Sequence, residues 1–357
     1  MLKKIFHIGG INKNLGGVAR YINLINGVQF KTISNIIICS DNPEDEKIIK
    51  FDFRYNFFTI FYKIYLLKKI IKRKKIKYFH VHTQKAALLV CLLKFLSHKI
   101  YIIYTPHGFR HTQVKNFKKF FHFCVELLIL LNVEKIILIS KYEVFNFKNN
   151  WLLKCFNFTY IPTAIPLPKN KKIHNLKKNY KINKNSKVII CIANLEKIKQ
   201  PDLFFAIAKN VIKNNLNTTF IYFGKCLDRR YRKFFNKDKR IIFAGYVDHL
   251  ILEQYLSQVD FYLNTSELET KSFSILESLS FGIPVICNGF EGSSELIKKN
   301  KTGFIYNFNN LEHASFIINN ILNKKCFIKK KVIIDNFKKI SNFSSFKKKY
   351  IKLYDKI

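Results

Sequence analysis

The stretch SELETKSFSILESLSFGIPVI, from Ser266 to Ile286, contains two glutamates, Glu269 and Glu277, separated by seven residues. Glu269 follows the apolar run VDFYLNTS, which predicts a strand, and Glu277 lies in a run with helical spacing. In a doubly wound sheet, ligands bind outside the carboxyl ends of the strands. We therefore expect Glu269 in a loop at such an end, followed by a helix that begins near Ser272.

This arrangement predicts a phosphate site with carboxylates beside it. The free N–H groups and the dipole of a helix N-terminus attract anions. Glu277, one to two turns into the helix, can only accept hydrogen bonds and suits the paired hydroxyls of a ribose. Glu269 can accept from sugar hydroxyls across the phosphate. Two isolated glutamates are more often solvated or capping residues, so the rest of the chain has to decide between these interpretations.

Short apolar, β-branched runs alternate with longer amphipathic runs along the 357 residues. This alternation is typical of parallel sheets covered by helices on both faces. It is interrupted by a basic segment that contains several prolines, and it begins again at Lys187. We therefore predict an α/β protein with two Rossmann-like, doubly wound domains, 1–165 and 187–340. A basic linker, 166–186, joins them, and a final helix occupies 341–357.

The net charge of +40 comes from 63 Lys and Arg residues against 23 Asp and Glu residues. It has three interpretations: a chain that is rich in lysine throughout, attraction to an anionic membrane, or binding of nucleic acid. Proteins that read base sequence use arginine for bidentate contacts, and this chain has few arginines and no zinc-finger spacing. We therefore predict no nucleic-acid partner, and the other two interpretations stay open.

The eight cysteines form no C-x-x-C pair, and most lie in apolar runs, as small core residues do in a reducing compartment. No run approaches the ~18 apolar residues of a membrane span, and the nearest candidate, FCVELLILLNV, is interrupted by Glu126. The apolar part of the N-terminal run is too short for a signal-peptide core. We expect a cytoplasmic protein, with peripheral attachment to the inner face of the plasma membrane as a further option.

The opening stretch resembles the E-x7-E region of the retaining glycosyltransferases of family 4, which share the GT-B fold. Downstream, EGSSELI and KTGFIYN resemble the segments that follow in this family. YIPTAIP, which precedes the second domain, stands where the family has its interdomain turn. Upstream, LGGVARYI, HVHTQKAALL and YTPHGF resemble segments of its first domain. The last run, SSFKKKYIKLYDKI, resembles a helix that crosses back to the first domain. Each motif alone is weak, but their order and spacing are specific.

The resemblance implies two domains that face across a cleft, and it assigns roles to residues. Glu269 would contact the transferred sugar, Glu277 would hold the ribose, and His107 would face the sugar near the reacting carbon. His82 and Lys85 would contact the acceptor. The remaining predicted donor-binding residues are Gly16, Gly17, Asn194, Lys199, Lys271, Ser272, Phe273 and Ser274.

Two departures from the family pattern affect the donor site. Asn194 stands where the family has an arginine, so a bidentate clamp on the diphosphate is lost. Lys199 stands where the family has its lysine and can still supply a point charge. Lys271 and Ser272 replace the usual Phe-Gly pair.

We expect no metal and no cofactor in this site. The chain has no D-x-D motif after an apolar strand, which metal-dependent sugar transfer in the other major fold requires. In the metal-free chemistry that the resemblance implies, a helix dipole and a lysine replace the cation. His80 and His82 could form a metal site, but we instead expect one of them to face the core and the other the cleft.

The sequence therefore predicts a retaining hexosyl- or N-acetylhexosaminyltransferase. It would move a sugar from a nucleotide-sugar, with UDP-sugar as the first choice, to a glycan acceptor that is lipid-linked, in the biosynthesis of surface polysaccharide or lipopolysaccharide. The helices LLKKIIKRKKIKY and VKNFKKFFHF interleave lysines with aromatic residues. They suit an anionic lipid surface or, equally, a solvated helix face of a lysine-rich chain.

Three alternatives remain at this point. A nucleotide-sugar epimerase of the same fold would bind the donor and need no acceptor. A non-catalytic protein of the same fold would bind nucleotide-sugar weakly, and Asn194 favours this reading. A basic adaptor for a membrane or nucleic acid would bind without nucleotide specificity and with a steep dependence on salt.

Overall fold

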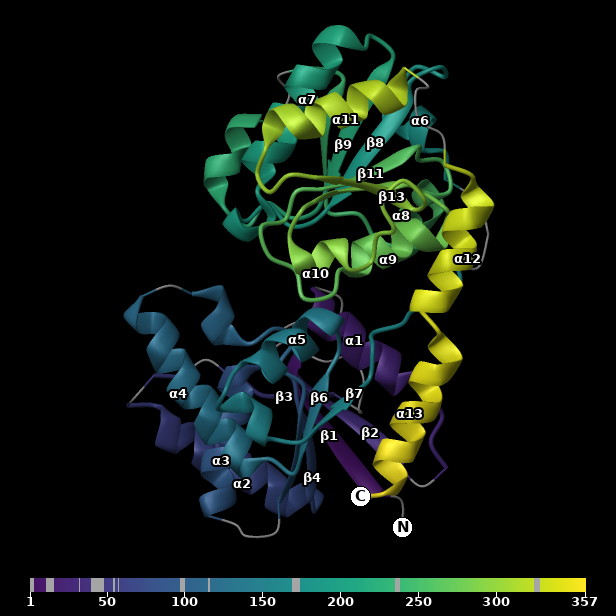
Figure 1. Ribbon diagram of the computed structural model, residues 1–357. Helices are drawn as coiled ribbons and strands as arrows, with labels where there is room; N and C mark the ends of the chain where they lie inside the picture. Colours follow the sequence, from purple (N-terminus) through teal and green to yellow (C-terminus); the bar gives the residue numbers. More distant parts are fainter. Residues whose placement is uncertain are drawn as a thin grey trace. The chain divides into compact units, whose positions relative to one another are not determined.

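The computed structural model describes residues 3–10, 16–31, 33–39, 48–53, 55–56, 58–96, 100–114, 116–168, 174–234, 238–323 and 328–357. The chain divides into two compact units. The first comprises Met1–Thr163 together with Phe343–Ile357, and the second comprises Ala164–Asn342. Each unit is built on a parallel sheet (Figure 1), which confirms the predicted α/β class. Among the described residues, no helix is both long enough and apolar enough to cross a bilayer.

The sheet of the first unit has seven strands in the order β3-β2-β1-β4-β5-β6-β7, and all pairs are parallel. The strands are β1 (Lys3–Gly10), β2 (Ile33–Cys39), β3 (Ile48–Lys50), β4 (Tyr78–Val81), β5 (Tyr101–Tyr104), β6 (Lys135–Leu138) and β7 (Phe158–Tyr160). The helices are α1 (Gly17–Asn26), α2 (Ile60–Lys74), α3 (Gln84–Phe95), α4 (Phe117–Asn132), α5 (Lys141–Asn149) and α13 (Phe343–Asp355), with the short 3-10 helices η1 (Arg110–Gln113) and η2 (Leu153–Cys155).

The two faces of this sheet differ because side chains alternate along each strand. Phe6 on β1 and Phe79 on β4 belong to an apolar core that also contains the buried residues of α3. On this face α3 contacts α2 on one side and α4 on the other. His7 and His80, one position further along the same strands, meet aromatic residues of α13 instead. The C-terminal helix thus completes the first unit, as the resemblance implied.

The sheet of the second unit has six parallel strands in the order β10-β9-β8-β11-β12-β13. They are β8 (Lys187–Ile192), β9 (Thr218–Phe223), β10 (Ile241–Gly245), β11 (Phe261–Asn264), β12 (Val285–Asn288) and β13 (Gly303–Tyr306). The helical elements are α6 (Leu176–Asn179), η3 (Lys197–Lys199), α7 (Pro201–Asn214), η4 (Arg229–Phe234), α8 (His249–Leu256), α9 (Phe273–Ser280), α10 (Glu291–Ser294), α11 (Leu311–Leu322) and α12 (Lys330–Ile340). Because β8 and β11 are neighbours, the loops that follow them meet at the carboxyl edge of the sheet.

A buried carboxyl group interrupts the apolar face of α4. Glu126 is fully buried, and its two oxygens accept hydrogen bonds from the Tyr104 hydroxyl and the Gln84 side-chain amide, each at 2.7 Å. Burial raises the pKa of Glu126 from 4.5 to about 7, although the two hydrogen bonds act in the opposite direction. The folded protein therefore holds this proton more tightly than the unfolded chain does.

This shift predicts that stability falls as the pH rises. The contribution of Glu126 is fully present below about pH 4.5 and is lost as the pH rises to about 7. Its size is about 3 kcal/mol, at 1.36 kcal/mol for each pKa unit. Glu126→Gln keeps a neutral, hydrogen-bonding side chain and should remove this part of the pH dependence in urea unfolding at pH 5 and pH 8. Glu312→Gln on the exposed side of α11 is the control, and an equal pH dependence in all three proteins would contradict the assignment.

Candidate functional site

An ion pair joins the first glutamate of the opening stretch to a lysine that is 70 residues earlier in the chain. The Lys199 ammonium lies 2.7 Å from Oε1 of Glu269, and the Ser266 hydroxyl donates to the same oxygen at 2.9 Å. Both side chains are largely buried, with 22% and 14% of their surfaces exposed. The structure therefore brings together two residues that the resemblance placed in the donor site.

Backbone contacts hold the two loops in this position. The Thr265 hydroxyl donates to the carbonyl of Lys199 at 2.9 Å, and the amide of Glu267 donates to the carbonyl of Ile198 at 2.8 Å. On the other side, the carbonyl of Glu269 packs against Gly292, where an added Cβ would lie only 1.6 Å from that oxygen. Glycine is needed at this position because no side chain fits there. The Glu269 loop is thus fixed by both of its neighbours.

The charge of Lys199 depends on Glu269. Burial alone would lower the pKa of Lys199, but the adjacent Glu269 carboxylate outweighs burial and raises the pKa above its usual value. Lys199 is therefore a permanent cation at the carboxyl edge of the sheet. Such a cation can neutralise a phosphate group that enters the site.

The helix that carries Glu277 begins where the sequence predicted. Ser272 is the N-cap of α9 and its hydroxyl accepts from the amide of Ile275 at 3.5 Å, while Phe273 is the first helical residue. Ser274 accepts from the Tyr262 hydroxyl at 2.7 Å and bonds to Ser272 at 3.1 Å. These bonds orient the first turn, whose N–H groups point out of the helix toward the loop.

Glu277, the fifth residue of α9, is buried and has a partner that the sequence analysis did not predict. Its Oε1 lies 2.6 Å from Nε2 of His249, the first residue of α8. The imidazole is half exposed. No local sequence pattern predicts that His249 contacts Glu277, because only the fold brings α8 and α9 together.

Lys271 does not extend into solvent. Its ammonium forms a 2.9 Å ion pair with Glu295, and both side chains are nearly buried, with 5% and 10% of their surfaces exposed. Lys271 therefore has an acidic partner within EGSSELI, so its charge is neutralised inside the second unit. This pair ties the Glu269 loop to the segment that follows β12.

We expect the loss of one partner of this pair to be costly. Glu295→Gln leaves a buried ammonium beside an uncharged group and should lower the free energy of unfolding by about 3–5 kcal/mol. The double variant Lys271→Met/Glu295→Leu removes both charges and should recover most of that loss. Urea unfolding of the two variants checks this prediction. A single variant as stable as the wild type would show that the pair is not buried in solution.

Asn194 has a structural partner at the end of β8. Its side-chain oxygen accepts from the amide of Lys225 at 3.2 Å, and its carbonyl accepts from the Tyr222 hydroxyl at 3.3 Å. The neighbouring Gly224, with φ of 152°, lies so close that an added Cβ would be 1.8 Å from the carbonyl oxygen of Ala193. Asn194 therefore joins the ends of β8 and β9.

In the first unit, His107 lies in a strained turn after β5. It has a φ of 54°, which is unusual for a residue other than glycine, and Gly108 follows with a φ of 94°. The buried carboxylate of Glu143 holds this turn, because it accepts from the amide of Gly108 at 2.6 Å and from that of Ile139 at 2.7 Å. Such strain persists only where the surrounding structure enforces it, and it is common at functional sites.

Glu143 was missed by the sequence analysis, although a signal was present. The segment SKYE has the S-x-x-E pattern of a capping box, and the Ser140 hydroxyl does accept from the amide of Glu143 at 3.0 Å. The carboxylate of Glu143 does not return to Ser140 but reaches the His107 turn. The pattern thus indicates the helix start, while only the fold shows what the carboxylate holds.

The expectation for His80 and His82 was wrong. Both are fully buried, with ring centroids 4.1 Å apart. His82 directly follows β4, and its amide continues the ladder onto Ile8, so it shares a face with His80 two residues earlier. His82 bonds to His107 through Nδ1 at 3.1 Å. Of the two predicted acceptor contacts, His82 is therefore inside the first unit, and Lys85 is exposed at the start of α3.

The two predicted glycines are at the beginning of α1. Gly16 is its N-cap residue, with a φ of 91° and open space where a Cβ would be, and Gly17 is the first helical residue. The competing glycine, Gly9, instead packs against the backbone and Cβ of His82. Gly16 therefore begins α1 with a backbone conformation that glycine favours, and its role at a donor site stays a prediction.

Comparisons with known proteins agree with these observations. Residues 172–340 match the model of the family Glycosyl transferases group 1. The UDP-Gal:alpha-D-GlcNAc-diphosphoundecaprenol alpha-1,3-galactosyltransferase of Escherichia coli is 26% identical over 316 residues, which cover 80% of this chain and 78% of that protein. An uncharacterized 41.2 kDa protein in the cps region of Klebsiella pneumoniae is 25% identical over 316 residues, which cover 85% and 86%.

A solved structure defines the fold. The Anabaena protein HepE, crystallised with UDP and glucose, matches with a TM-score of 0.80 over 100% of both chains, at 14% identity. The predicted GT-B fold is therefore confirmed. The second unit, in addition, is similar to the glycosyl transferases of group 1.

Proposed function

We propose that this protein is a retaining glycosyltransferase of family 4 that transfers a sugar from a UDP-sugar to a lipid-linked glycan. The observation that carries the proposal is the cluster at the carboxyl edge of the second sheet: the Lys199–Glu269 pair, the N-terminus of α9 and Glu277. A cation, a set of helix N–H groups and two carboxylates match a diphosphate that is flanked by a sugar and a ribose.

In this proposal the diphosphate lies against the N-terminus of α9 and Lys199, which stabilise its charge as it leaves the sugar. Glu269 accepts hydrogen bonds from hydroxyls of the transferred sugar, and Glu277 accepts from the ribose. His107 orients the sugar near the reacting carbon. The departing phosphate oxygen takes the proton of the attacking acceptor hydroxyl, so no protein carboxylate has to act as a base.

We propose that no metal takes part in this reaction, because Lys199 and the helix N-terminus supply the positive charge that a cation would supply. The side chain of Asn194 accepts a hydrogen bond from the backbone amide of Lys225. In this proposal Asn194 therefore does not take over the role of the missing arginine. Turnover is then expected to persist in EDTA. The donor affinity should be lower than that of a protein with the arginine clamp.

The choice of donor and acceptor is supported by the Escherichia coli relative. Its name states a UDP-galactose donor and an acceptor with a diphosphoundecaprenol lipid. At 26% identity we extend only the class of donor and the class of acceptor from the relative to this chain. The identity of the sugar and the linkage are left open. The proposal therefore includes both hexosyl and N-acetylhexosaminyl donors, in the assembly of a surface polysaccharide or lipopolysaccharide.

Nucleotide release from a panel of UDP- and GDP-sugars tests this function. Purified protein is incubated with each donor, with and without a membrane-lipid extract, and the nucleotide and sugar products are quantified. UDP release that requires the extract would support the transferase. Conversion of the donor sugar without extract would indicate an epimerase, and binding without any conversion would indicate a non-catalytic protein.

We also propose that the first unit works on the cytoplasmic face of an anionic membrane. Two helices of this unit expose an unusual number of aromatic residues beside lysines. The exposed aromatic residues are Phe58, Phe61, Tyr62 and Tyr65 at the beginning of α2, and Phe117, Phe120 and Phe121 at the beginning of α4. We call this set the aromatic surface.

The two parts of the aromatic surface belong to the same face of the unit. α3 packs between α2 and α4, so the three helices cover one side of the sheet. Exposed basic residues, such as Lys118 and Lys119 on α4, accompany the aromatic side chains. Aromatic and basic residues in this combination favour the interfacial region of an anionic bilayer, where rings enter the boundary and lysines meet phosphates. A lipid-linked acceptor would be delivered at the same surface.

Vesicle sedimentation tests this surface. Phe117→Ser/Phe120→Ser should weaken binding to phosphatidylglycerol-containing vesicles by ~10-fold or more, since each buried phenylalanine contributes about 1.5–3 kcal/mol. The matched control is Phe308→Ser/Phe316→Ser, which removes two exposed rings from the second unit. If both double variants bind these vesicles equally well, the assignment of this surface is refuted. If the wild-type protein binds neutral vesicles as well as it binds phosphatidylglycerol-containing vesicles, the proposed dependence on negative charge is refuted.

A further inference from the structure

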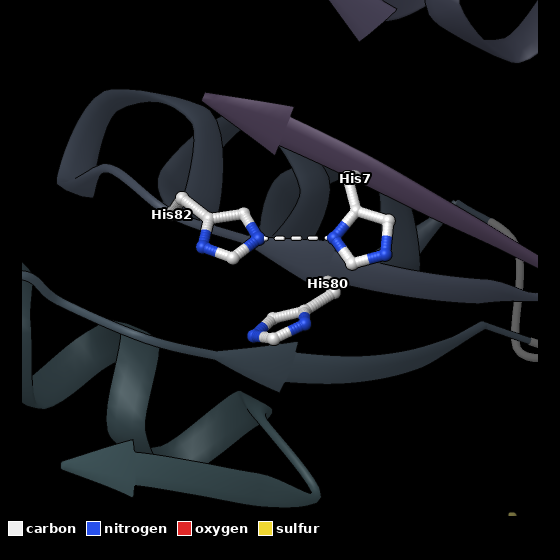
Figure 2. A group of neighbouring side chains, drawn as sticks. All are labelled: His7, His80 and His82. Atoms are coloured by element: carbon white, nitrogen blue, oxygen red, sulfur yellow. Dashed lines mark hydrogen bonds between the residues drawn. The ribbon is translucent and has the colours of Figure 1, made fainter. Parts of the chain in front are cut away.

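A continuous chain of hydrogen bonds runs through the first unit from His107 to the C-terminal helix. Nε2 of His107 lies 3.1 Å from Nδ1 of His82, and Nε2 of His82 lies 3.2 Å from Nδ1 of His7. Nε2 of His7 lies 3.4 Å from the Tyr354 hydroxyl, which lies 2.7 Å from Nδ1 of His80. Figure 2 shows His7 facing His82, with His80 beside them. The chain ends at Thr105, 2.8 Å from Nε2 of His80.

The fold assembles this chain from distant segments. β1 and β4 are neighbouring parallel strands in which His7 lies opposite His80, and His82 follows two residues later on the same face. Tyr354 arrives from α13, at the other end of the sequence. His7, His80, His82 and Tyr354 are fully buried, so their polar atoms depend on one another.

The charge state of the rings makes the chain directional. Burial lowers the pKa of His80 and His82 well below 6.5 and that of His107 to about 3. A neutral imidazole has one N–H, so it donates through one nitrogen and accepts through the other. The direction of any one bond in the chain therefore sets the direction of all the others.

The Tyr354 hydroxyl selects one of the two directions. Its proton belongs in the 2.7 Å bond to His80, a normal length for a hydroxyl donor, and not in the 3.4 Å bond to His7. His7 then donates to Tyr354 through Nε2, and it accepts from His82 through Nδ1. His82 in turn accepts from His107, which leaves His107 protonated on Nε2.

We propose that this chain is a tautomer relay, in which Tyr354 holds His107 in the Nε2–H form through His7 and His82. His7, His82 and Tyr354 are then positioning residues, and Nδ1 becomes the acceptor nitrogen of the His107 ring. Together with Glu143, which fixes the turn backbone, the relay fixes the ring. A role of the relay in catalysis rests on the proposed function, in which His107 faces the sugar. The relay itself does not depend on the proposed function.

The same three buried histidines offer an alternative. His7, His80 and His82 each have a ring nitrogen within 4.8 Å of the others, which is close enough for a metal ion after small shifts. We favour the relay because every ring nitrogen named in the chain already has a hydrogen-bond partner at 2.7–3.4 Å. A bound metal would break these bonds, so the two alternatives exclude one another.

NMR of the histidine side chains tests the relay without any substrate. In the full-length protein labelled with ¹⁵N-histidine, His107 should show a protonated Nε2 and an unprotonated Nδ1, with its signals assigned from a His107→Asn variant. Tyr354→Phe removes the hydroxyl that accepts from His7 and donates to His80, and it keeps the ring. The His7 proton should then move to Nδ1, the chain should reverse, and His107 should change to the Nδ1–H form.

Tyr350→Phe is the control, because this buried hydroxyl on the same helix bonds to Tyr21 at 2.6 Å. It should leave the His107 tautomer unchanged. Three results would overturn the relay: an Nδ1–H form in the wild type, no change in Tyr354→Phe, or histidine signals that respond to EDTA or to added zinc.

Turnover separates the relay from the proposed function. If both hold, Tyr354→Phe should lower kcat by about tenfold or more, with a smaller change in KM, because an imidazole in the wrong tautomer cannot make its hydrogen bond to the reacting group. If the wild type has no transfer activity but the tautomer change is observed, the proposed function fails and the relay stands.

Discussion

Lys199→Met is expected to lower kcat/KM for donor turnover by about 10²–10³-fold. Lys199 is the cation at the carboxyl edge of the second sheet, and the raised pKa keeps it charged. Methionine keeps much of the volume of the side chain but leaves the departing diphosphate without this charge. Initial rates of UDP release, measured over a range of donor concentrations, give the effect directly.

The control for this variant is Lys225→Met. Lys225 is also a lysine at the carboxyl edge of the same sheet, but its ammonium lies over the ring of Tyr246, 4.9 Å from the centroid. It should lose less than about tenfold, because its ammonium lies against the Tyr246 ring and not beside Glu269. Equal losses in both variants would mean that Lys199 acts only through the overall charge of the protein.

Glu269→Gln is expected to lower kcat/KM by a comparable factor of about 10²–10³. It removes the acceptor for the sugar hydroxyls and also lowers the pKa of Lys199, since the Glu269 carboxylate is what raises it. Glutamine preserves the size of the side chain and can still accept from Ser266. Because the variant also leaves the largely buried Lys199 ammonium without its anion, turnover is compared at a temperature at which the variant is fully folded.

A double variant shows whether the two residues act as a unit. Because the Lys199 ammonium and the Glu269 carboxylate are 2.7 Å apart, Lys199→Met/Glu269→Gln should be less impaired than the product of the two single losses. Losses that multiply would show that the two side chains work independently. That outcome would contradict a shared donor site.

The order of the elements could be predicted from the sequence because the alternation of runs is strong. β8, for example, is a continuous apolar run that begins at Lys187, where the prediction placed it. The edge strands β3 and β7 were not predicted, since each has only three residues. Short edge strands carry almost no periodic signal, and only the neighbouring strand reveals them.

The site could be predicted only in part, because periodicity does not give the order of strands in a sheet. The helix start at Ser272 was predicted correctly from local spacing. The contact between Lys199 and Glu269 was not predicted, since it depends on β8 and β11 being neighbours. The family pattern placed both residues in one site, but the pairing itself is visible only in the fold.

Buried polar partners were the main feature that sequence patterns did not reveal. The ion pair of Lys271 and Glu295 and the bond of His249 to Glu277 both join separate segments. The error at His80 and His82 had a different cause. The alternation of strand side chains was available, and it requires residues two apart to share a face.

The transfer of labelled sugar into lipid is the measurement that tests the proposed function most directly. Protein is incubated with UDP-[¹⁴C]galactose, UDP-[¹⁴C]glucose or UDP-[¹⁴C]N-acetylglucosamine and a membrane-lipid extract, and radioactivity is measured in the organic and aqueous phases. We expect label in the organic phase that requires both protein and extract and is lost in Lys199→Met and Glu269→Gln. Label that stays in the aqueous phase with every donor, with correctly folded protein and active extract, would contradict the proposed function.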